Sequence, residues 1–571
     1  MKSLFIKFNM EKHGQAQRVN WVKQLDLQSL LDVFDSPAWI VSELQLKHNI
    51  EAFARFTGVN NQILFPVKTN PSITILQLFA ALGVGADCAS RAEIDLARFA
   101  GINIQSISYN SPVQDVQLCK FLLEEGARVV MDDTEAILEL QKVIGNKTFK
   151  GKLLLRLNLP NYIGYSNKSD NQELMAHGHS SSKFGIPVED LDGFLTKVTL
   201  PISGIHVHVG TQMDNIESFE FALNELHSWA EQIIKLGFPI SEINMGGGLG
   251  IPFIESDCFP SLESWVESLS KHKKEKFNYF VEPGHALVGN AVALLMRVLT
   301  VKNSRGKKWA ITDVGTDQLT KITLLRWPHR ILNAKGEELP QGIDAIAGPL
   351  CFAGDTLLEN ISVEGLSKNS PLLLTEAGAY TYSLANGFNG RLAPKWILLK
   401  ADGEILETMR KEDRYENSQY ANFNWGLVTE SREPQALQID HVLQLSSSYL
   451  RETSSEDSFS YVHVLKQSDN TYEFVVSTSS EVSFISMPFA IRILGDAAII
   501  AVLHNDGYEA KREAVWGRRL VMDCFDKLAS NQDVRFTLSL SDANESGLFK
   551  ARVVRFASSC GKCVGSFILY Y

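Results

Sequence analysis

The sequence predicts an α/β protein that combines a (β/α)8 barrel, a β-sandwich or β-barrel domain and an additional C-terminal α+β module. Three observations favour this fold class. Short β-like runs alternate with amphipathic stretches between about Asn61 and Gly289, as βα units require. After Gly289 the pattern changes to alternating strands and turns. The chain of 571 residues is also too long for one ordinary domain.

The predicted barrel rests on eight β-like runs with helical stretches between them. The runs are Gln62–Lys68, Gly85–Ala89, Ser106–Asn110, Arg128–Asp132, Leu153–Leu157, Gly204–Val209, Glu242–Gly246 and Tyr279–Glu282. Apolar residues recur at three- and four-residue spacing in the helical stretches Ile73–Leu82, Arg91–Ala100, Asp115–Glu125 and Ile216–Leu236. In such a barrel the reacting groups gather at the carboxyl ends of the strands.

The domain boundaries follow from these changes of pattern. We expect residues 1–45 to contribute to the β-domain, residues 46–290 to form the barrel, residues 291–415 to form the β-domain, and residues 416–571 to form the C-terminal module. Runs such as Leu295–Lys302 and Trp396–Leu399 predict strands of the β-domain. The C-terminal module is predicted to hold a helix at Arg512–Ala529 and strands at Tyr461–Lys466, Tyr472–Ser477, Arg535–Leu540 and Arg552–Phe556.

Composition narrows the class of protein. The net charge of −11 offers no basic surface for nucleic acid or for an anionic membrane. No apolar run is long enough to span a bilayer or to act as a signal peptide, so we expect a cytoplasmic protein. The 7 cysteines are scattered, which argues against a disulfide framework and suits a reducing compartment.

Lys68 ends the first predicted strand, within Phe65-Pro66-Val67-Lys68-Thr69-Asn70. A lysine at this place points into the barrel mouth, where its amine could bond covalently to an aldehyde cofactor. A lone lysine at a strand end is more commonly solvated. The interpretation therefore depends on the other motifs.

Three further motifs follow predicted strands. Gly246-Gly247-Gly248 could let backbone N–H groups cradle a phosphate, or could simply form a tight turn. His206 and His208 alternate along one strand, so one could lie flat on a planar cofactor while Thr211 binds a phosphate. A zinc pair or ordinary barrel filling remains open for the histidines, but no third ligand has suggestive spacing and no metal site is expected. Glu282 could keep a pyridine nitrogen protonated, as an electron sink requires.

The ordered motifs resemble those of the fold-type III decarboxylases that depend on pyridoxal 5′-phosphate (PLP), and within them the diaminopimelate decarboxylases. The resemblance runs from about Ser36 to Tyr415. It implies an alanine-racemase-like barrel with a β-domain, the cofactor PLP, a small amino-acid-derived substrate and a homodimer with shared active sites. It rests on the following motifs: Pro66-Val67-Lys68-Thr69-Asn70, Ser182-Lys183-Phe184-Gly185, His206-Val207-His208-Val209-Gly210-Thr211, Gly246-Gly247-Gly248, Glu282-Pro283-Gly284, Gly348-Pro349-Leu350-Cys351, Gly378-Ala379-Tyr380 and Phe388-Asn389-Gly390-Arg391.

The resemblance also implies roles for single residues. Lys68 would hold PLP covalently, His208 would stack on its ring, and Glu282 would pair with the pyridine nitrogen. Cys351 would reach in from the partner subunit and return a proton after CO2 departs. A thiol is a plausible acid at neutral pH, although free cysteines are often simply buried. The phosphate would be bound by Thr211, Gly247, Gly248 and Tyr380.

The departures from the family concern the substrate. The family's acidic residue after the cysteine is replaced by Phe352, and its arginine after Glu-Pro-Gly is replaced by His285. In the Asp-x-Gly segment that begins at Asp313, Lys321 stands in place of a carboxylate-binding arginine, and Leu325 in place of a tyrosine. Lysine is no bidentate substitute for arginine. The residues expected to meet the substrate are Asp313, Lys321, Phe352 and His285.

These departures predict a substrate whose far end is larger or less charged than that of diaminopimelate, because a buried charge without its partner costs several kcal/mol. We expect an amino acid or a conjugate, with carrier-linked groups among the conjugates, in a specialised pathway such as siderophore or modified-peptide synthesis. The alternatives are diaminopimelate decarboxylase proper, a PLP-dependent racemase, and a non-catalytic binding or regulatory protein. In the C-terminal module, Arg492-Ile493-Leu494-Gly495-Asp496-Ala497 has the spacing of an acetyltransferase loop.

Overall fold

The protein is described from a computed structural model. It describes residues 4–5, 21–145, 147–159, 165, 182–254, 256–325, 327–409, 435–446, 458–468, 470–479, 487–508, 516–524, 533–540, 544–546, 549–558 and 563–570. The chain divides into two compact units, Met1–Ala421 and Asn422–Tyr571. Each unit is described by itself. No helix in the described residues is long and apolar enough to cross a membrane.

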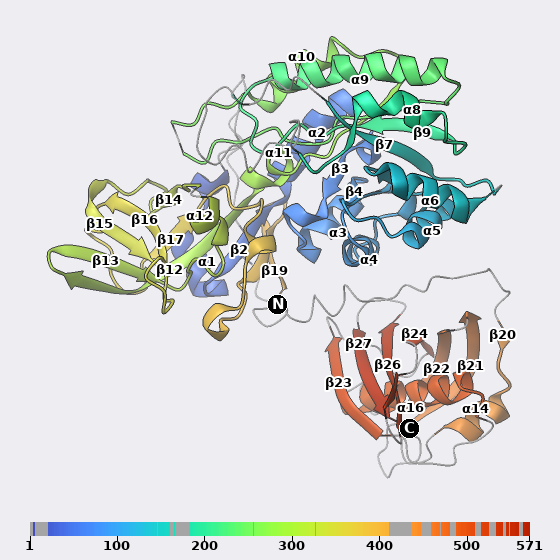
Figure 1. Ribbon diagram of the computed structural model, residues 1–571. Coiled ribbons are helices and arrows are strands. Elements are labelled where there is room, and N and C mark those ends of the chain that lie inside the picture. Colours follow the sequence, from blue (N-terminus) through green and yellow to red (C-terminus); the bar gives the residue numbers. More distant parts are fainter. Residues whose placement is uncertain are drawn as a thin grey trace. The chain divides into compact units, whose positions relative to one another are not determined.

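The first unit contains the predicted barrel (Figure 1). Its parallel strands are β3 (Leu64–Pro66), β4 (Gly85–Cys88), β5 (Ile107–Asn110), β6 (Arg128–Met131), β7 (Lys152–Asn158), β9 (Ile202–His206), β10 (Glu242–Asn244) and β11 (Asn278–Phe280). They follow one another round the sheet, with the short β8 (Ile186–Pro187) added beside β7. A parallel bridge between Ile63 and Val281 joins the first strand to the last. The barrel is therefore nearly closed, which confirms the predicted fold class.

The helices of the barrel form where caps and apolar stripes predict them. Asp115, for example, accepts the N–H groups of Gln117 and Leu118 and so caps α5, which ends at Gly126 in the left-handed conformation. The buried faces of these helices pack on the outside of the strands. The helices are α2 (Glu43–Thr57), α3 (Ile73–Ala81), α4 (Arg91–Phe99), α5 (Val116–Glu125), α6 (Thr134–Ile144), α8 (Leu191–Leu195), α9 (Glu217–Lys235), α10 (Leu262–Ser270) and α11 (His285–Val288).

The β-domain of the same unit is a single curled sheet. The N-terminal strand β2 (Ala38–Ser42) lies between β12 and β18, so the start of the chain is paired into this sheet. Two short helices, α1 (Leu27–Phe34) and α12 (Thr320–Leu325), belong to it. The remaining strands are β1 (Leu4–Phe5), β12 (Val292–Ser304), β13 (Lys307–Thr312), β14 (Ile331–Leu332), β15 (Gln341–Ala347), β16 (Thr356–Ile361), β17 (Pro371–Leu374), β18 (Lys395–Leu399) and β19 (Glu404–Met409).

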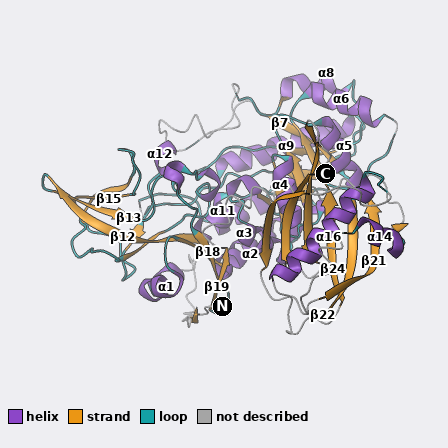
Figure 2. Ribbon diagram, turned by 90° about the horizontal axis from the view of Figure 1, so that it is seen from below, coloured by secondary structure: helices purple, strands orange, loops and turns teal. Residues whose placement is uncertain are grey.

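The second unit is an antiparallel sheet with a long helix against one face (Figure 2). The strand order is β20-β21-β22-β24-β26-β27-β23, with β25 beside β26. The helix α16 (Met487–Asn505) buries apolar residues on nearly every side, as a helix enclosed by other elements must. The other elements are α14 (Ile439–Leu445), β20 (Gln435–Ala436), β21 (Ser458–Ser468), β22 (Thr471–Ser479), β23 (Trp516–Cys524), β24 (Asp533–Leu540), β25 (Asn544–Ser546), β26 (Phe549–Ser558) and β27 (Cys563–Tyr570).

One prediction for this unit is wrong. The predicted helix Arg512–Ala529 contains the strand β23, which pairs with β27 along its whole length. Pairing with a distant strand here overrides the local helical pattern. The segment Arg492–Ala497, whose spacing matches an acetyltransferase loop, lies inside α16, so its backbone N–H groups serve the helix and the match has no structural support.

Candidate active site

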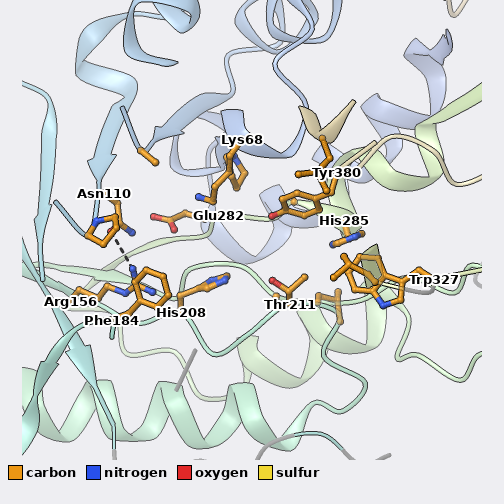
Figure 3. Close-up of a pocket in the computed structure, with 18 residues that line it drawn as sticks. Lys68, Asn110, Arg156, Phe184, His208, Thr211, Glu282, His285, Trp327 and Tyr380 are labelled. Atoms are coloured by element: carbon orange, nitrogen blue, oxygen red, sulfur yellow. Dashed lines mark hydrogen bonds between the residues drawn. The ribbon is translucent and has the colours of Figure 1, made fainter. Parts of the chain in front are cut away.

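A pocket of about 410 Å³ lies at the carboxyl ends of the barrel strands. Figure 3 shows Lys68, Glu282 and His208 in its middle, with Asn110, Arg156 and Phe184 at one end and Tyr380, His285, Thr211 and Trp327 at the other. The barrel supplies the first groups, and the β-domain supplies Trp327 and Tyr380. The remaining lining residues are Pro66, Ala89, Pro112, Gly248, Leu249, Gly284, Leu325 and Leu384.

Lys68 projects from a single 3-10 turn (Val67–Thr69) that follows β3, and its side chain is 45% exposed in the pocket. Its Nζ lies 2.7 Å from Oδ2 of Asp87, which is fully buried on the neighbouring strand β4. Burial lowers the pKa of Lys68, but the charges of Asp87, Tyr380 and Glu282 outweigh it and hold this pKa above its usual value. Burial and the nearby Glu282 raise the pKa of Asp87. Lys68 is therefore a protonated ammonium that faces the pocket at the mouth of the barrel.

Glu282, which follows β11, is 4% exposed, and both of its carboxylate oxygens have partners. Asn244 donates its Nδ2–H to Oε1 at 2.7 Å, and Nε2 of His206 lies 3.1 Å from Oε2. Although burial would raise the pKa of Glu282, these two partners and Lys68 hold it below its usual value. Glu282 is therefore a buried carboxylate that stays ionised.

The two histidines of β9 and its extension separate into different environments. His206 is fully buried beneath Glu282, and burial lowers its pKa. His208 lies beyond the end of the strand and lines the pocket opposite Lys68 (Figure 3). Its Nδ1 accepts the backbone N–H of Gly247 at 3.0 Å. That bond fixes the orientation of the imidazole at the face of the cavity.

The glycine run brings backbone close to the pocket. A Cβ on Gly247 would lie 2.0 Å from the carbonyl oxygen of Glu282, and Gly248 has φ +122°. No side chain can be added at either position without moving the backbone. Thr211 and Tyr380 lie at the same end of the pocket (Figure 3), and Tyr380 has φ +53°. Close backbone N–H groups beside two hydroxyls are the chemistry that binds a phosphate.

His285 lies at the same end of the pocket as Thr211 and Tyr380 (Figure 3). It is 4% exposed, its ring centroid lies 4.9 Å from that of Tyr380, and its Nε2 has no hydrogen-bond partner among the described residues. A buried donor or acceptor without a partner is costly, so this atom fits a site that is completed by a polar ligand. The residues present therefore fit PLP: the Tyr380 end of the pocket would hold its phosphate, and Lys68 and His208 would hold its ring.

The structure places two of the expected substrate residues away from the pocket. Lys321, on α12, is fully buried and donates from Nζ to the carbonyl oxygen of Ala379 at 2.8 Å. Asp313 accepts the hydroxyl of Ser36 at 2.5 Å and the backbone N–H of Arg297 at 2.9 Å. The sequence prediction that these two side chains contact the substrate is therefore corrected. Both side chains form bonds within the protein and do not line the pocket.

Cys351 and Phe352 lie on an exposed loop and do not line the pocket described for their own chain. Asp355 fixes this loop, because its carboxylate accepts the N–H groups of Thr316 at 2.7 Å and Leu350 at 2.8 Å. The N–H of Cys351 is bonded to Oδ1 of Asn389 at 3.0 Å. The thiol is therefore carried on an ordered turn at the surface.

Sequence reasoning did not assign several groups that the structure brings to the site. Asp87 is signalled only by an acidic residue inside an otherwise apolar strand. Arg156 is buried with its guanidinium carbon 4.4 Å from the ring centroid of Phe184. Asn244 precedes the glycine run and acts through Glu282. None of the three stands in a motif with recognisable spacing.

Comparison with known proteins agrees with this geometry. Residues 44–289 match the family "Pyridoxal-dependent decarboxylase, pyridoxal binding domain". The diaminopimelate decarboxylase of Methanocaldococcus jannaschii is 27% identical over 409 residues, which are 68% of this chain and 92% of that protein. The diaminopimelate decarboxylase of Zymomonas mobilis is 27% identical over 416 residues, which are 69% of this chain and 97% of that protein.

Solved structures share the fold. The diaminopimelate decarboxylase of Helicobacter pylori complexed with L-lysine superposes with a TM-score of 0.60 at 22% identity, and covers 69% of this chain and 98% of its own. The lysine/ornithine decarboxylase of Vibrio vulnificus complexed with putrescine gives a TM-score of 0.55 at 20% identity, and covers 67% and 99%. Residues 44–289 are thus a pyridoxal-binding domain of the PLP-dependent decarboxylases, and the chain shares the fold of these carboxy-lyases over about two thirds of its length.

Proposed function

We propose that this decarboxylase acts on an amino acid or amino-acid conjugate whose far end is larger or less charged than that of diaminopimelate, in a specialised biosynthetic pathway. The position of Lys321 carries the proposal. The side chain that stands where the family has a carboxylate-binding arginine is turned into the protein and bonded to the carbonyl of Ala379. Among the residues that line the described pocket, Arg156 and Lys68 are the cationic side chains, and Glu282 is the acidic one.

A charged far end of a substrate would therefore meet few partners in this chain. Arg156 lies at the end of the pocket that also holds Asn110, and its guanidinium is already close to Asp132, with 3.8 Å between Nη1 and Oδ2. Glu282 is engaged by Asn244 and His206. Desolvating an unpaired ammonium or carboxylate costs several kcal/mol, which is enough to exclude a substrate.

We assign the cofactor roles from the same geometry. Lys68 would hold the aldehyde of PLP through its amine, His208 would face the ring, and Glu282 would pair with the pyridine nitrogen. Thr211, Gly247, Gly248 and Tyr380 would bind the phosphate. When bound, PLP supplies the electron sink for loss of a carboxyl group as CO2. An ionised Glu282 keeps the ring nitrogen protonated, because its charge favours the protonated form.

Decarboxylation replaces the carboxyl group of the substrate with a proton, so the site needs an acid. We propose that Cys351 supplies this proton in the pocket of a partner subunit, as part of a homodimer. The loop that carries it is ordered by Asp355, and large apolar side chains lie exposed near it: Phe352 is 49% exposed, and Phe388 and Leu392 are each 50% exposed. Exposed apolar side chains gathered near one loop are typical of a surface that another subunit covers.

Diaminopimelate decarboxylase proper is the second candidate, supported by the names of the relatives. Release of CO2 from a panel of substrates separates the two. The panel should contain meso-diaminopimelate, lysine, ornithine, arginine and conjugates in which the far amine or carboxyl is acylated or amidated. Higher kcat/KM for a conjugate or a less charged amino acid supports the proposal. Highest kcat/KM for meso-diaminopimelate would contradict it.

A variant at Lys321 tests whether this residue sets the choice of substrate. Because Lys321 does not reach the pocket, Lys321→Arg is not expected to raise kcat/KM for meso-diaminopimelate by as much as tenfold, which would equal about 1.4 kcal/mol. Absence of CO2 release from every compound, together with no visible absorbance band that borohydride removes, would instead favour a non-catalytic binding protein.

A further inference from the structure

Three basic side chains are buried together behind the Tyr380 end of the pocket. Lys321 is 0% exposed, His329 1% and His285 4%. Phe253 contacts all three: its ring centroid lies 4.7 Å from Nζ of Lys321, 4.7 Å from the ring centroid of His329 and 5.9 Å from that of His285. We call Lys321, His329 and His285 the buried basic cluster.

The cluster has fewer polar partners than buried basic groups normally have. Lys321 Nζ has the carbonyl oxygen of Ala379 as its hydrogen-bond acceptor, and His329 Nδ1 lies 2.9 Å from the carbonyl oxygen of Thr375. The Nε2 atoms of His285 and His329 have no partner in the described part of the chain. Buried charges are usually paired, so these groups can hold a charge only if an anion joins them.

Two acidic side chains of the described residues near Lys321 are engaged by other groups, and one of them is Asp317, whose Oδ2 meets Gln318 at 2.8 Å and Arg391 at 3.5 Å. Glu376 is the acidic group whose charge acts on Lys321, but its carboxylate is bonded to Arg330 and to the hydroxyl of Thr375. A further titratable group at the cluster is the phenol of Tyr380, whose ring centroid lies 4.9 Å from that of His285 with 44° between the ring planes. An anion that would let the cluster hold a proton would therefore enter from the pocket.

His285 connects the cluster to the pocket. It lines the cavity beside Gly284, Thr211 and Tyr380 (Figure 3), at the end where glycine backbone and hydroxyl groups converge. Lys321 lies behind it and fixes the carbonyl that precedes Tyr380. Contact with an anion at His285 would thus be felt electrostatically by all three basic groups.

We propose that the buried basic cluster is a proton-linked anion subsite: His285 contacts the phosphate of the cofactor, and the cluster takes up a proton when that phosphate enters. The proposal rests on PLP binding in this pocket, as proposed above. It assigns His285 and Lys321 to the cofactor rather than to the substrate.

The electrostatics explain why a proton must enter. Burial lowers the pKa of Lys321 to about 7, and burial together with the charge of Lys321 holds the pKa of His285 and His329 well below the usual range. Without an anion the cluster is therefore largely uncharged above neutral pH. A phosphate dianion beside it raises these pKa values, and a raised pKa at constant pH means proton uptake.

Calorimetry on the full-length chain freed of cofactor tests this directly. Pyridoxine 5′-phosphate and pyridoxine both lack the aldehyde, so neither reacts with Lys68. Each is titrated at pH 8 in two buffers with different enthalpies of ionisation. We expect the phosphorylated ligand to take up between about 0.5 and 1 proton more than pyridoxine, since a group with a pKa near 7 is mostly deprotonated at this pH. Equal proton uptake by the two ligands would overturn the proposal.

Variants of the cluster show which side chain takes up the proton. Lys321→Met should lower the affinity for pyridoxine 5′-phosphate at least about 10-fold and reduce the uptake, whereas Lys321→Arg should keep affinity and lose uptake, because a guanidinium stays charged. His285→Asn should lower the affinity for the phosphorylated ligand more than for pyridoxine. The exposed Lys335→Met is the matched control and should change nothing. Unaltered affinity and uptake in both Lys321→Met and His285→Asn would contradict the proposal.

Failure of this inference is distinguishable from failure of the proposed function. Borohydride reduction of the PLP-loaded protein reports attachment at Lys68 independently of the cluster. A protein that binds PLP at Lys68 without the extra proton uptake would keep the proposed function and exclude the anion subsite. A protein that binds no PLP would exclude both.

Discussion

The buried ammonium of Lys321 makes the stability of the cofactor-free protein depend on pH, and Lys321→Met should remove that dependence. Burial lowers the pKa of Lys321 from 10.5 to about 7 in the folded protein. Between these two values the unfolded chain holds a proton that the folded chain lacks, so the free energy of unfolding rises with pH. Below about pH 7 both states are protonated, and the cost of burying the charge is fully present.

The size of the effect follows from the same values. Within this window each pH unit changes the free energy of unfolding by up to about 1.4 kcal/mol. Between pH 7.5 and pH 9.5 the wild-type protein should therefore gain about 2.5 kcal/mol relative to Lys321→Met. Methionine has a similar length and no charge, so the variant keeps the packing against Phe253 and loses the bond to Ala379 at every pH.

Denaturant unfolding followed by tryptophan fluorescence measures this difference. Of the 9 tryptophans, 7 lie in the first compact unit, so the signal reports mainly on the unit that contains Lys321. The free energy of unfolding of Lys321→Met, relative to that of wild type, should be higher at pH 7.5 than at pH 9.5. Lys335→Met, at an exposed position, should follow wild type at both pH values. If the free energies of unfolding of Lys321→Met and wild type differ by the same amount at both pH values, the lowered pKa of Lys321 is refuted.

Three further changes test the pocket itself. Asp87→Asn removes the carboxylate 2.7 Å from Lys68, so burial should then dominate and lower the pKa of the Lys68 amine. The pH profile of the reaction between Lys68 and an amine reagent should shift to lower pH. An unchanged profile would contradict the pairing of Lys68 with Asp87. Glu282→Gln should retain PLP but slow turnover by at least about 10²-fold, the order of one acid–base interaction; unchanged kcat would remove Glu282 from its role. Co-expressed Cys351→Ala and Lys68→Ala chains should regain up to about a quarter of wild-type activity, because random pairing leaves one intact site in each heterodimer; heterodimers no more active than the parents would show that Cys351 does not act across the dimer.

The barrel could be predicted because each of its strands is a short apolar run bounded by turn residues. Arg128–Asp132, for example, is predicted within one residue of the observed β6. Lys68 lies two residues beyond β3, in a 3-10 turn, rather than inside the strand. Strand ends in a barrel carry the polar site residues, so they lose the apolar pattern that marks the strand.

Pairings between distant residues could not be predicted in the same way. The contact of Lys68 with Asp87 depends on the register of β3 against β4, in which Pro66 faces Asp87. The inward turn of Lys321 depends on the position of Ala379 in another segment. The strand β23 forms because β27 is available to pair with it. Each outcome is decided by tertiary contacts that a local pattern does not encode.

Locating the cofactor on the chain shows whether Lys68 holds PLP in this pocket. The protein is purified with PLP, reduced with borohydride and digested, and the modified peptide is identified by mass spectrometry. We expect one reduced pyridoxyl group per chain, attached to the peptide that contains Lys68, and none in Lys68→Ala. A label on another lysine, or a wild-type chain that carries none, would contradict it.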